Sequence, residues 1–316
     1  MILITGGRGY VGSAIAKNLK QQYQDKKIII SSQKAQSEQC WEGSDFLYAH
    51  YDCFNQEALR ALCQNVEAII HLAAIDETKT EQDPNLALQV NTLGTLNLLE
   101  AAKLTGVKRF IYFSTAHVYG TPLSGILSES SCTKPLTHYA LTHKFAEDYV
   151  LAYSYKNPEF CSTVFRLSNA IGVPGNVNCQ RWTLLVNDLC KQAVTQQQLV
   201  LRSTGLQYRD FITLADVGVA VKYFLNDAPP IKAQGVFNLG SGISMRVIEM
   251  AQLIQQRYKA LFDFLPPIIR PASQQVEADH DQFMYSNKKI VELGVQFNHD
   301  LARAIDETLL FCHKLF

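Results

Sequence analysis

Short apolar runs alternate with longer amphipathic stretches along the first half of the chain. Runs rich in β-branched and aromatic residues predict strands at residues 1–5, 27–30, 46–48, 68–72, 109–114 and 162–166. Stretches with an apolar face predict helices between them, at residues 12–22, 56–63, 86–104 and 139–153. Nearly all-apolar strands separated by helices are typical of a parallel sheet covered on both faces. The pattern therefore predicts an α/β protein with a doubly wound parallel sheet.

After about residue 168 this alternation becomes irregular. A loop rich in Gly, Pro and Asn covers residues 172–179, and helical patterns follow at 182–195 and 244–257, with one more strand at 235–239. We therefore expect a smaller C-terminal lobe whose segments interleave with the first domain. The expected division is 1–168 for the first domain, with 207–240 returning to it, and 169–206 with 241–316 for the smaller lobe.

Composition narrows the class of protein. The 29 basic and 29 acidic side chains balance, which argues against a nucleic acid or an anionic membrane surface as partner. No apolar run reaches the roughly 18–20 residues of a membrane span, and Met1 leads directly into a strand-like run rather than a signal peptide. The eight cysteines are scattered without metal-site spacing, so buried, reduced thiols and no metal are expected. These features favour a soluble, cytoplasmic globular protein.

A glycine-rich loop follows the first predicted strand and opens the first predicted helix. Glycines at 6, 9 and 12 allow a tight turn, close approach to a pyrophosphate and close helix–strand packing. The helix N-terminus adds free N–H groups and a partial positive charge. This context predicts a dinucleotide-binding Rossmann domain. The loop residues expected at the cofactor are Gly6, Arg8, Gly9, Tyr10, Val11 and Gly12.

The end of the second predicted strand bears on the choice of dinucleotide. An acidic residue that binds the adenosine ribose is usual about 20 residues after the glycines, but Ser31 and Ser32 stand there instead. Small hydroxyls with a nearby cation accept a 2′-phosphate that a carboxylate would repel. Arg8 or Lys34 is the expected source of that cation. The sequence favours NADP and leaves NAD open.

Several further motifs follow in order along the chain. They are His71-Leu72-Ala73-Ala74, Val90-Asn91-Thr92, Phe113-Ser114-Thr115, Tyr139-Ala140-Leu141-Thr142-His143, Arg166-Leu167-Ser168-Asn169, Arg209-Asp210-Phe211 and Asn238-Leu239-Gly240. With the glycine loop they resemble the extended short-chain dehydrogenase/reductase family of NAD(P)-dependent nucleotide-sugar epimerases, dehydratases and reductases, over nearly the whole chain. The resemblance implies cofactor contacts from Asp52, Ala73 and Ala74, substrate phosphate contacts from Asn169 and Arg209, and a possible homodimer.

The chemistry of hydride transfer at a sugar carbon requires a group that takes and returns the alcohol proton. Tyr139 is the candidate base, and Thr115 is a second hydroxyl that polarises the same oxygen. In the family that this chain resembles, a lysine four residues after the tyrosine lowers the tyrosine pKa and binds the nicotinamide ribose.

This chain has His143 at that position, and its lysine is Lys144. Five residues correspond to about 140° around a helix, so Lys144 is expected to point elsewhere. We expect His143 to replace the lysine and assign it to the catalytic group. Three interpretations stay open: an active enzyme tuned differently, a weak or altered activity, or a cofactor-binding protein that has lost turnover.

A second departure concerns the reaction. The residues after Thr115 are Ala116 and His117, where the family's dehydratases carry an Asp–Glu pair that eliminates water. An epimerase is therefore favoured, with an NADPH-dependent keto-sugar reductase as the alternative. A hydroxysteroid- or dihydroflavonol-type reductase would have no use for Asn169 and Arg209. His117 and Arg181, the latter in the polar loop 174–182, are the further residues expected at a nucleotide sugar.

Overall fold

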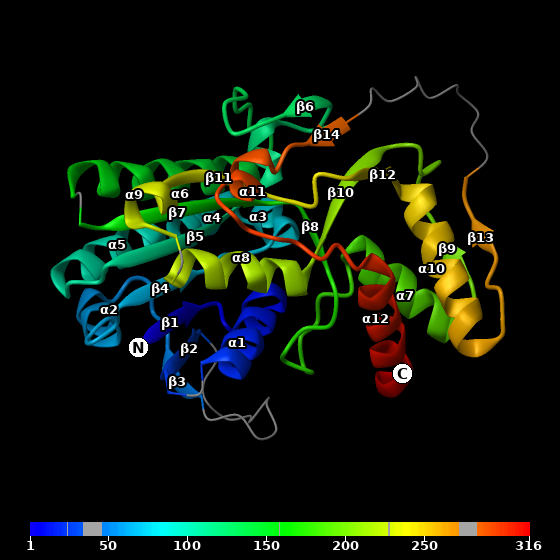
Figure 1. Cartoon of the computed structure of the whole chain (residues 1–316), viewed down its shortest axis with the longest axis horizontal. Helices are drawn as coiled ribbons and strands as arrows, with labels where there is room; N and C mark the ends of the chain where they lie inside the picture. The colour runs from blue at the N-terminus through cyan, green and yellow to red at the C-terminus, as the bar shows by residue number, and fades with distance from the viewer. Residues whose placement is uncertain (24, 34–45, 158, 227, 272–282) are drawn as a thin grey trace.

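A seven-stranded parallel sheet forms the centre of the protein (Figure 1). The computed structural model describes residues 1–23, 25–33, 46–157, 159–226, 228–271 and 283–316. The strand order is β11-β7-β5-β4-β1-β2-β3, and every pair is parallel. The strands are β1 (Ile2–Thr5), β2 (Ile28–Ser32), β3 (Leu47–His50), β4 (Ala68–His71), β5 (Arg109–Thr115), β7 (Cys161–Leu167) and β11 (Gly235–Leu239). The order changes direction between β1 and β4, which confirms the predicted doubly wound Rossmann sheet.

Each face of the sheet has its own apolar core. Along β1, Ile2 and Ile4 belong to one core, and Leu3 between them belongs to the other. This alternation explains why the strands are nearly all apolar: both faces are buried. The covering helices are α1 (Tyr10–Gln22) and α8 (Leu214–Asn226) on one face, and α2 (Gln56–Leu62), α5 (Gly94–Leu104) and α6 (His138–Lys156) on the other.

The helix predicted over residues 86–104 is interrupted. It consists of α4 (Pro84–Ala87), a π-helical segment (Leu88–Leu93) and α5. Asn91 lies in the π-helical segment, accepts the Ile75 amide at 2.8 Å and donates to Thr142 Oγ1 at 3.1 Å. Apolar periodicity does not distinguish a widened turn from a regular one, so the sequence could not predict this interruption.

The smaller lobe is built on three helices that share a third core. These are α7 (Leu185–Gln196), α10 (Val247–Phe262) and α12 (Leu301–Leu315). They lie at the right of Figure 1, beside a three-stranded sheet of β12 (Ser244–Arg246), β10 (Tyr208–Thr213) and β8 (Asn169–Ile171). Within the segment 207–240, β10 joins this small sheet, whereas α8 and β11 pack with the central sheet.

Two helix starts in the smaller lobe were predicted too early. The helix expected from residue 182 begins at Leu185. The helix expected from residue 244 begins at Val247, because Ser244–Arg246 pair with β10 before the Glu249 side chain accepts the Arg246 amide at 2.7 Å and caps the helix. The remaining short elements are α3 (Glu77–Gln82), a 3₁₀ turn (Ala116–Tyr119), β6 (Gly125–Leu127), β9 (Leu199–Val200), α9 (Pro230–Ala233), β13 (Ile268–Ile269), β14 (Phe283–Tyr285) and α11 (Lys288–Glu292).

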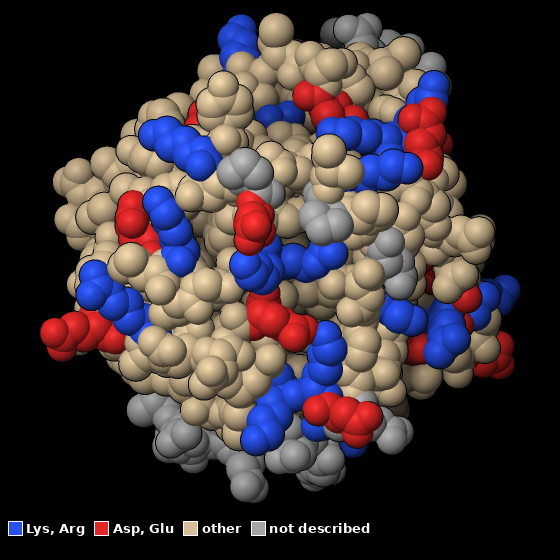
Figure 2. Space-filling view, turned by 60° about the vertical axis from the view of Figure 1, so that its left-hand side comes forward, with Lys and Arg blue, Asp and Glu red and all other residues tan. Residues whose placement is uncertain are grey.

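The surface and the thiols can be compared with the expectations from composition. Figure 2 shows basic and acidic side chains interspersed over one face. Among the residues that the structure describes, the free thiols are buried except Cys132, which is exposed, so the expectation that all cysteines are buried was wrong for this residue. Within the described ranges, no group of three or more His, Cys, Asp or Glu side chains is placed to hold a metal ion. None of the helices that the structure describes combines the length and apolar character that a membrane crossing needs.

Candidate active site

The glycine loop between β1 and α1 lies against the end of β4. Gly6 has φ +66°, and a Cβ there would lie 2.8 Å from the Ala73 nitrogen. A Cβ on Gly12 would lie 2.5 Å from the Gly6 carbonyl oxygen. Gly9 precedes α1 without a side-chain cap, so the first-turn amides of Tyr10 and Val11 face outward from the helix start. This bare, positive helix end is a cradle that fits a dinucleotide pyrophosphate.

The residues predicted for the adenosine half lie at the ends of β2 and β3. Ser31 is fully buried, and its Oγ has no hydrogen-bond partner among the described residues. Ser32 ends β2, and Asp52 follows β3, where its carboxylate accepts the Phe54 amide at 2.9 Å. Lys34 lies outside the described residues. The unpartnered Ser31 hydroxyl fits a ligand that brings its own polar atoms to this end of the sheet.

A buried hydrogen-bond chain fixes the end of β4 beside the glycine loop. His71 lies between Thr5 Oγ1, 2.6 Å from its Nδ1, and Thr95 Oγ1, 2.9 Å from its Nε2. Thr95 donates its own proton to the Asn91 carbonyl, so it accepts from His71 Nε2–H, and Thr5 donates to Nδ1. Burial lowers the His71 pKa to about 3, so the ring is neutral. This series of hydrogen bonds positions the backbone of Ala73, whose amide donates to Thr5 Oγ1 at 3.3 Å.

Thr115 and Tyr139 come from neighbouring elements. Thr115 ends β5, and its Oγ1 accepts the His117 amide at 3.2 Å. Tyr139 lies in the first turn of α6, which begins where Thr137 accepts the Ala140 amide and which packs against β5 and the 3₁₀ turn. Burial raises the pKa of Tyr139 well above its usual range, Glu77 and Asp76 raise it further, and Arg181 lowers it.

His143 lies one turn after Tyr139, because α6 is regular over this stretch. The two ring centroids are 4.5 Å apart, and His143 Nδ1 lies 2.8 Å from the hydroxyl of Tyr112 on β5. His143 is 4% exposed, and burial lowers its pKa to about 4, so the ring is neutral at pH 7. Lys144 forms an ion pair with Asp148 and therefore points away from Tyr139, as the helix period predicted.

Arg209 and Asn169 lie side by side on β10 and β8. The Arg209 guanidinium donates to Asn169 Oδ1 at 3.3 Å, and the Asn169 amide donates to the Asp210 carbonyl at 2.8 Å. The Asp210 carboxylate instead accepts from Ser168, Ser241 and Gly242, and Asp216 accepts from Thr213 and the amides of Asn298 and His299. Within the described part of the chain, the ion pairs formed do not include Arg209. A half-buried guanidinium of this kind suits a diphosphate.

Asp76 and Glu77, which sequence reasoning missed, meet the predicted substrate residue Arg181. The Arg181 guanidinium lies 3.5 Å from the Asp76 carboxylate and 3.4 Å from that of Glu77. Burial lowers the pKa of His117, Glu77 raises it and Arg209 lowers it, so the field of Glu77 reaches both Tyr139 and His117. The signal available in the sequence was an acidic pair shortly after His71–Ala74. The first residue of that pair, Asp76, caps the start of α3.

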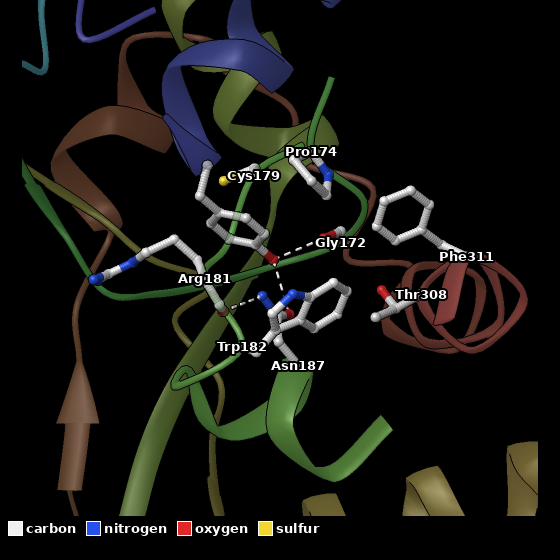
Figure 3. A pocket seen from close by; sticks show the side chains of 9 residues that line it. Gly172, Pro174, Cys179, Arg181, Trp182, Asn187, Thr308 and Phe311 are labelled. Atoms are coloured by element: carbon white, nitrogen blue, oxygen red, sulfur yellow. Dashed lines mark hydrogen bonds between the residues drawn. The ribbon is translucent and has the colours of Figure 1, made fainter. Parts of the chain in front are cut away.

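The loop that carries Arg181 is bound to the start of α1. The Tyr10 hydroxyl donates to the Gly172 carbonyl at 2.7 Å and lies 3.1 Å from Asn187 Oδ1, and the Asn187 amide donates to the Arg181 carbonyl at 3.1 Å (Figure 3). Asn176 donates to the Arg8 carbonyl at 2.9 Å, and the Gly175 amide donates to Ser13 Oγ at 3.1 Å. The glycine loop and the loop at 172–182 therefore form one connected unit.

Comparison with known proteins agrees with this fold. The model of the NAD dependent epimerase/dehydratase family matches residues 2–240. The chain is 27% identical to mouse dTDP-D-glucose 4,6-dehydratase over 272 residues, covering 82% of this chain and 73% of that protein. It is 26% identical to the UDP-glucose 4-epimerase of Erwinia amylovora over 286 residues, covering 81% and 82%. The UDP-glucose 4-epimerase of Thermotoga maritima, solved with UDP-glucose, has the same fold, with TM-score 0.82, 21% identity and coverage of 99% and 98%.

Proposed function

The chain belongs to the NAD-dependent epimerase/dehydratase family, and we propose that within this family it is a nucleotide-sugar epimerase. The observation that carries the proposal is that Thr115 and Tyr139 lie on elements that pack together, the end of β5 and the first turn of α6. Ala116 and His117 directly follow Thr115. Epimerisation by oxidation and reduction at one carbon needs a single proton-transfer group, whereas loss of water needs an acid and a base at the next carbon. Ala116 cannot serve as either.

A dinucleotide bound here would supply the hydride acceptor and donor for the sugar carbon. The residues that would hold its pyrophosphate are Gly6, Gly9, Gly12 and the first-turn amides of Tyr10 and Val11, with Arg8 beside them. Ser31, Ser32 and Asp52 would contact the adenosine half, and the backbone of Ala73 and Ala74 would pass beside the cofactor. The Cβ clashes at Gly6 and Gly12 support this assignment, because they mark the closest approach of the loop to its neighbours.

Proton transfer falls to Tyr139 and Thr115. Tyr139 Oη takes the proton of the sugar hydroxyl during oxidation. It returns the proton after the sugar ring has turned its other face toward the dinucleotide. Thr115 Oγ1 donates a hydrogen bond to the same sugar oxygen and keeps it oriented. Arg209 and Asn169 would bind the substrate diphosphate, and His117 would face the sugar. His143 lies behind Tyr139, where it holds the helix against β5 through Tyr112.

For the cofactor we propose NADP over NAD. Ser31 and Ser32 stand where a carboxylate would exclude a 2′-phosphate, and Ser31 Oγ has no partner within the described residues. Titration calorimetry with each dinucleotide tests this choice. We expect tighter binding of NADP, and a Ser31→Asp variant should reverse the preference. Tighter binding of NAD by the unmodified protein would overturn the preference while leaving the epimerase proposal intact.

The epimerase proposal is tested with UDP-, dTDP-, GDP- and CDP-sugars. A thermal-shift screen with each cofactor first identifies the nucleotide, because a ligand that binds the folded state raises the melting temperature. Product analysis should then show a C-epimer of the sugar without net consumption of dinucleotide. Net oxidation of NADPH with a 4-keto sugar nucleotide would indicate the keto-sugar reductase instead. Binding without any turnover would indicate a cofactor-binding protein.

A further inference from the structure

A buried ring nitrogen next to the proposed base lacks a partner in the part of the chain that the structure describes. His143 is 4% exposed, and its Nε2 forms no hydrogen bond with any described residue. The other ring nitrogen, Nδ1, lies 2.8 Å from the hydroxyl of Tyr112. Most buried polar side-chain atoms are hydrogen-bonded. An exception of this kind at a ligand site therefore indicates a polar group that the ligand supplies.

A count of donors and acceptors assigns the proton of this ring. The Tyr112 hydroxyl is buried, and its hydrogen-bond partner among the described residues is His143 Nδ1. If Tyr112 donates to Nδ1, the ring proton lies on Nε2, and Nε2–H alone is left unpaired. If Nδ1–H donates instead, both the Tyr112 proton and Nε2 are left unpaired. Because each unpaired buried group costs free energy, the first arrangement is favoured and Nε2 is an N–H donor.

This donor lies at the carboxyl ends of the central strands. Tyr112 is opposite His71 of β4 in the sheet, and His71 is opposite Thr5 of β1, which the glycine loop follows. The ring centroids of His71 and Tyr112 are 5.7 Å apart, and those of Tyr112 and His143 are 6.0 Å apart. Ligands of open α/β sheets bind at these strand ends, where the strand order changes direction. The His143 ring therefore belongs to the same end of the sheet as the dinucleotide cradle.

The position of Tyr139 indicates which part of a dinucleotide reaches this nitrogen. With the pyrophosphate at the glycine loop and the adenosine half at Ser31, the half that carries the nicotinamide extends toward the proposed base. Hydride transfer requires the nicotinamide beside the sugar carbon whose oxygen Tyr139 binds. His143 follows Tyr139 by one helical turn, with the two ring centroids 4.5 Å apart. The polar groups next to the nicotinamide are the hydroxyls of its ribose, whose oxygens accept hydrogen bonds.

We propose that Tyr112 holds His143 as the Nε2–H tautomer and that this N–H donates to a hydroxyl oxygen of the ribose next to the nicotinamide. The inference rests on the proposed dinucleotide site. Burial lowers the pKa of His143 to about 4, so the donor is a neutral imidazole near pH 7. His143 is a cofactor-binding residue in this proposal, and Tyr112 is a positioning residue that acts through it.

Truncated ligands test the contact without turnover. The ADP-ribose part of the dinucleotide keeps the second ribose, whereas the ADP part ends at the pyrophosphate, and both carry the 2′-phosphate in the NADP series. In calorimetry, His143→Leu should bind the dinucleotide and its ADP-ribose part about fivefold more weakly, the usual worth of one neutral hydrogen bond. Binding of the ADP part should not change, and this ligand also reports that the variant retains a folded glycine loop.

Two further variants complete this experiment. His143→Gln should regain most of the affinity, because its amide can accept from Tyr112 and donate to the ribose. His313→Leu replaces an exposed histidine of α12 and should bind all three ligands as the unmodified protein does.

A second readout needs no ligand. Long-range ¹H–¹⁵N NMR spectra distinguish the two neutral tautomers of histidine, and the signals of His143 are those that His143→Gln lacks. We expect the Nε2–H form in the unmodified protein and a mixture of both forms in Tyr112→Phe, because the hydrogen bond at one ring nitrogen determines which nitrogen carries the proton. Tyr112→Phe should weaken binding of the ADP-ribose part by less than His143→Leu does.

The outcomes separate this inference from the proposed function. Selective weakening in His143→Leu, with no epimerisation of any nucleotide sugar by the unmodified protein, would reject the epimerase and keep the ribose contact. Equal weakening of all three ligands, unchanged binding of all three, or an Nδ1–H tautomer in the unmodified protein would overturn the inference and leave the epimerase standing. If none of the three ligands binds the unmodified protein, the dinucleotide site and the inference both fail.

Discussion

The two sides of Tyr139 differ in how they use charge. On the interior side, His143 and His71 are buried and neutral, and each is bound to hydroxyl groups of neighbouring strands or helices. Toward the loop at 172–182, which we call the entrance side, Arg181, Asp76 and Glu77 are partly exposed and paired with one another, and they belong to a loop and a helix start. The comparison teaches that this site keeps buried, neutral histidines behind the base and places its ion pairs in partly exposed segments.

The physical reason is desolvation. Full burial disfavours the charged form of a side chain, and burial therefore lowers the pKa of His71 and His143. Arg181, Asp76 and Glu77 at the entrance are partly exposed and therefore keep part of their hydration. A neutral histidine at position 143 therefore avoids the desolvation cost of a charged side chain buried at the same place.

The largest effect is expected from removal of the Tyr139 hydroxyl, the proposed base. Tyr139→Phe should reduce kcat about 10²- to 10⁴-fold, the usual contribution of a positioned proton-transfer group. Dinucleotide affinity should change little, because the cradle is formed by the glycine loop. Steady-state kinetics together with calorimetry check both statements. Tyr155→Phe on the same helix is the control, and retention of most of the activity by Tyr139→Phe would contradict the assignment of the base.

The interior side makes a testable contribution to stability. The His143 pKa is lowered to about 4, so the unfolded chain binds a proton here that the folded protein does not bind between about pH 6.5 and 4. The free energy of unfolding should therefore be highest above pH 6.5 and fall as the pH decreases toward 4. A difference of 2.5 pKa units corresponds to about 3 kcal/mol. Urea titrations at stepwise lower pH measure this loss.

The matched variant for that prediction is His143→Gln. It removes the titrating ring and keeps a polar side chain that can accept from Tyr112, so its stability should decline less steeply between pH 6.5 and 4. His71, with its pKa lowered to about 3, contributes a similar slope that this variant leaves in place. Parallel curves for the two proteins would show that His143 is not held neutral by the fold.

On the entrance side, Arg209 is expected to act on binding rather than on proton transfer. Arg209→Gln removes a charge-assisted contact to the diphosphate, and a loss of about 2 kcal/mol corresponds to a roughly 30-fold higher KM. The value of kcat and its acid limb should stay near those of the unmodified enzyme. Initial-rate measurements over a range of substrate and pH check this. A shifted acid limb would place Arg209 among the charges that act on the base.

The fold could be predicted because the hydrophobic pattern that specifies it is local and repeats along the chain. Leu3 and its neighbours Ile2 and Ile4 face opposite cores, so a short apolar run identifies a strand buried on both sides. The place of His143 followed from the helix period alone, and so did the direction of Lys144. These statements depend on spacing within one element, which the sequence contains.

The entrance could not be predicted in the same way. Arg181 and Glu77 are 104 positions apart, and they meet because a polar loop without periodicity is seated on α1 by Tyr10, Asn176 and Asn187. No pattern in residues 172–182 determines that path. The prediction of Arg181 as a substrate residue did not include its two carboxylate partners.

The smallest expected effect separates the contribution of the interior side to stability from proton transfer. Tyr112→Phe removes the hydroxyl that lies 2.8 Å from His143 Nδ1 and leaves a buried nitrogen without that partner. The cost to the free energy of unfolding should be about 1–2 kcal/mol, as for other buried hydrogen bonds that lose one partner. The acid limb of kcat should not move, because no charge is added or removed near Tyr139. Thermal unfolding and a pH–rate profile of the same sample measure the two quantities. A stable variant with a displaced acid limb would mean that the interior side acts on the ionisation of the base.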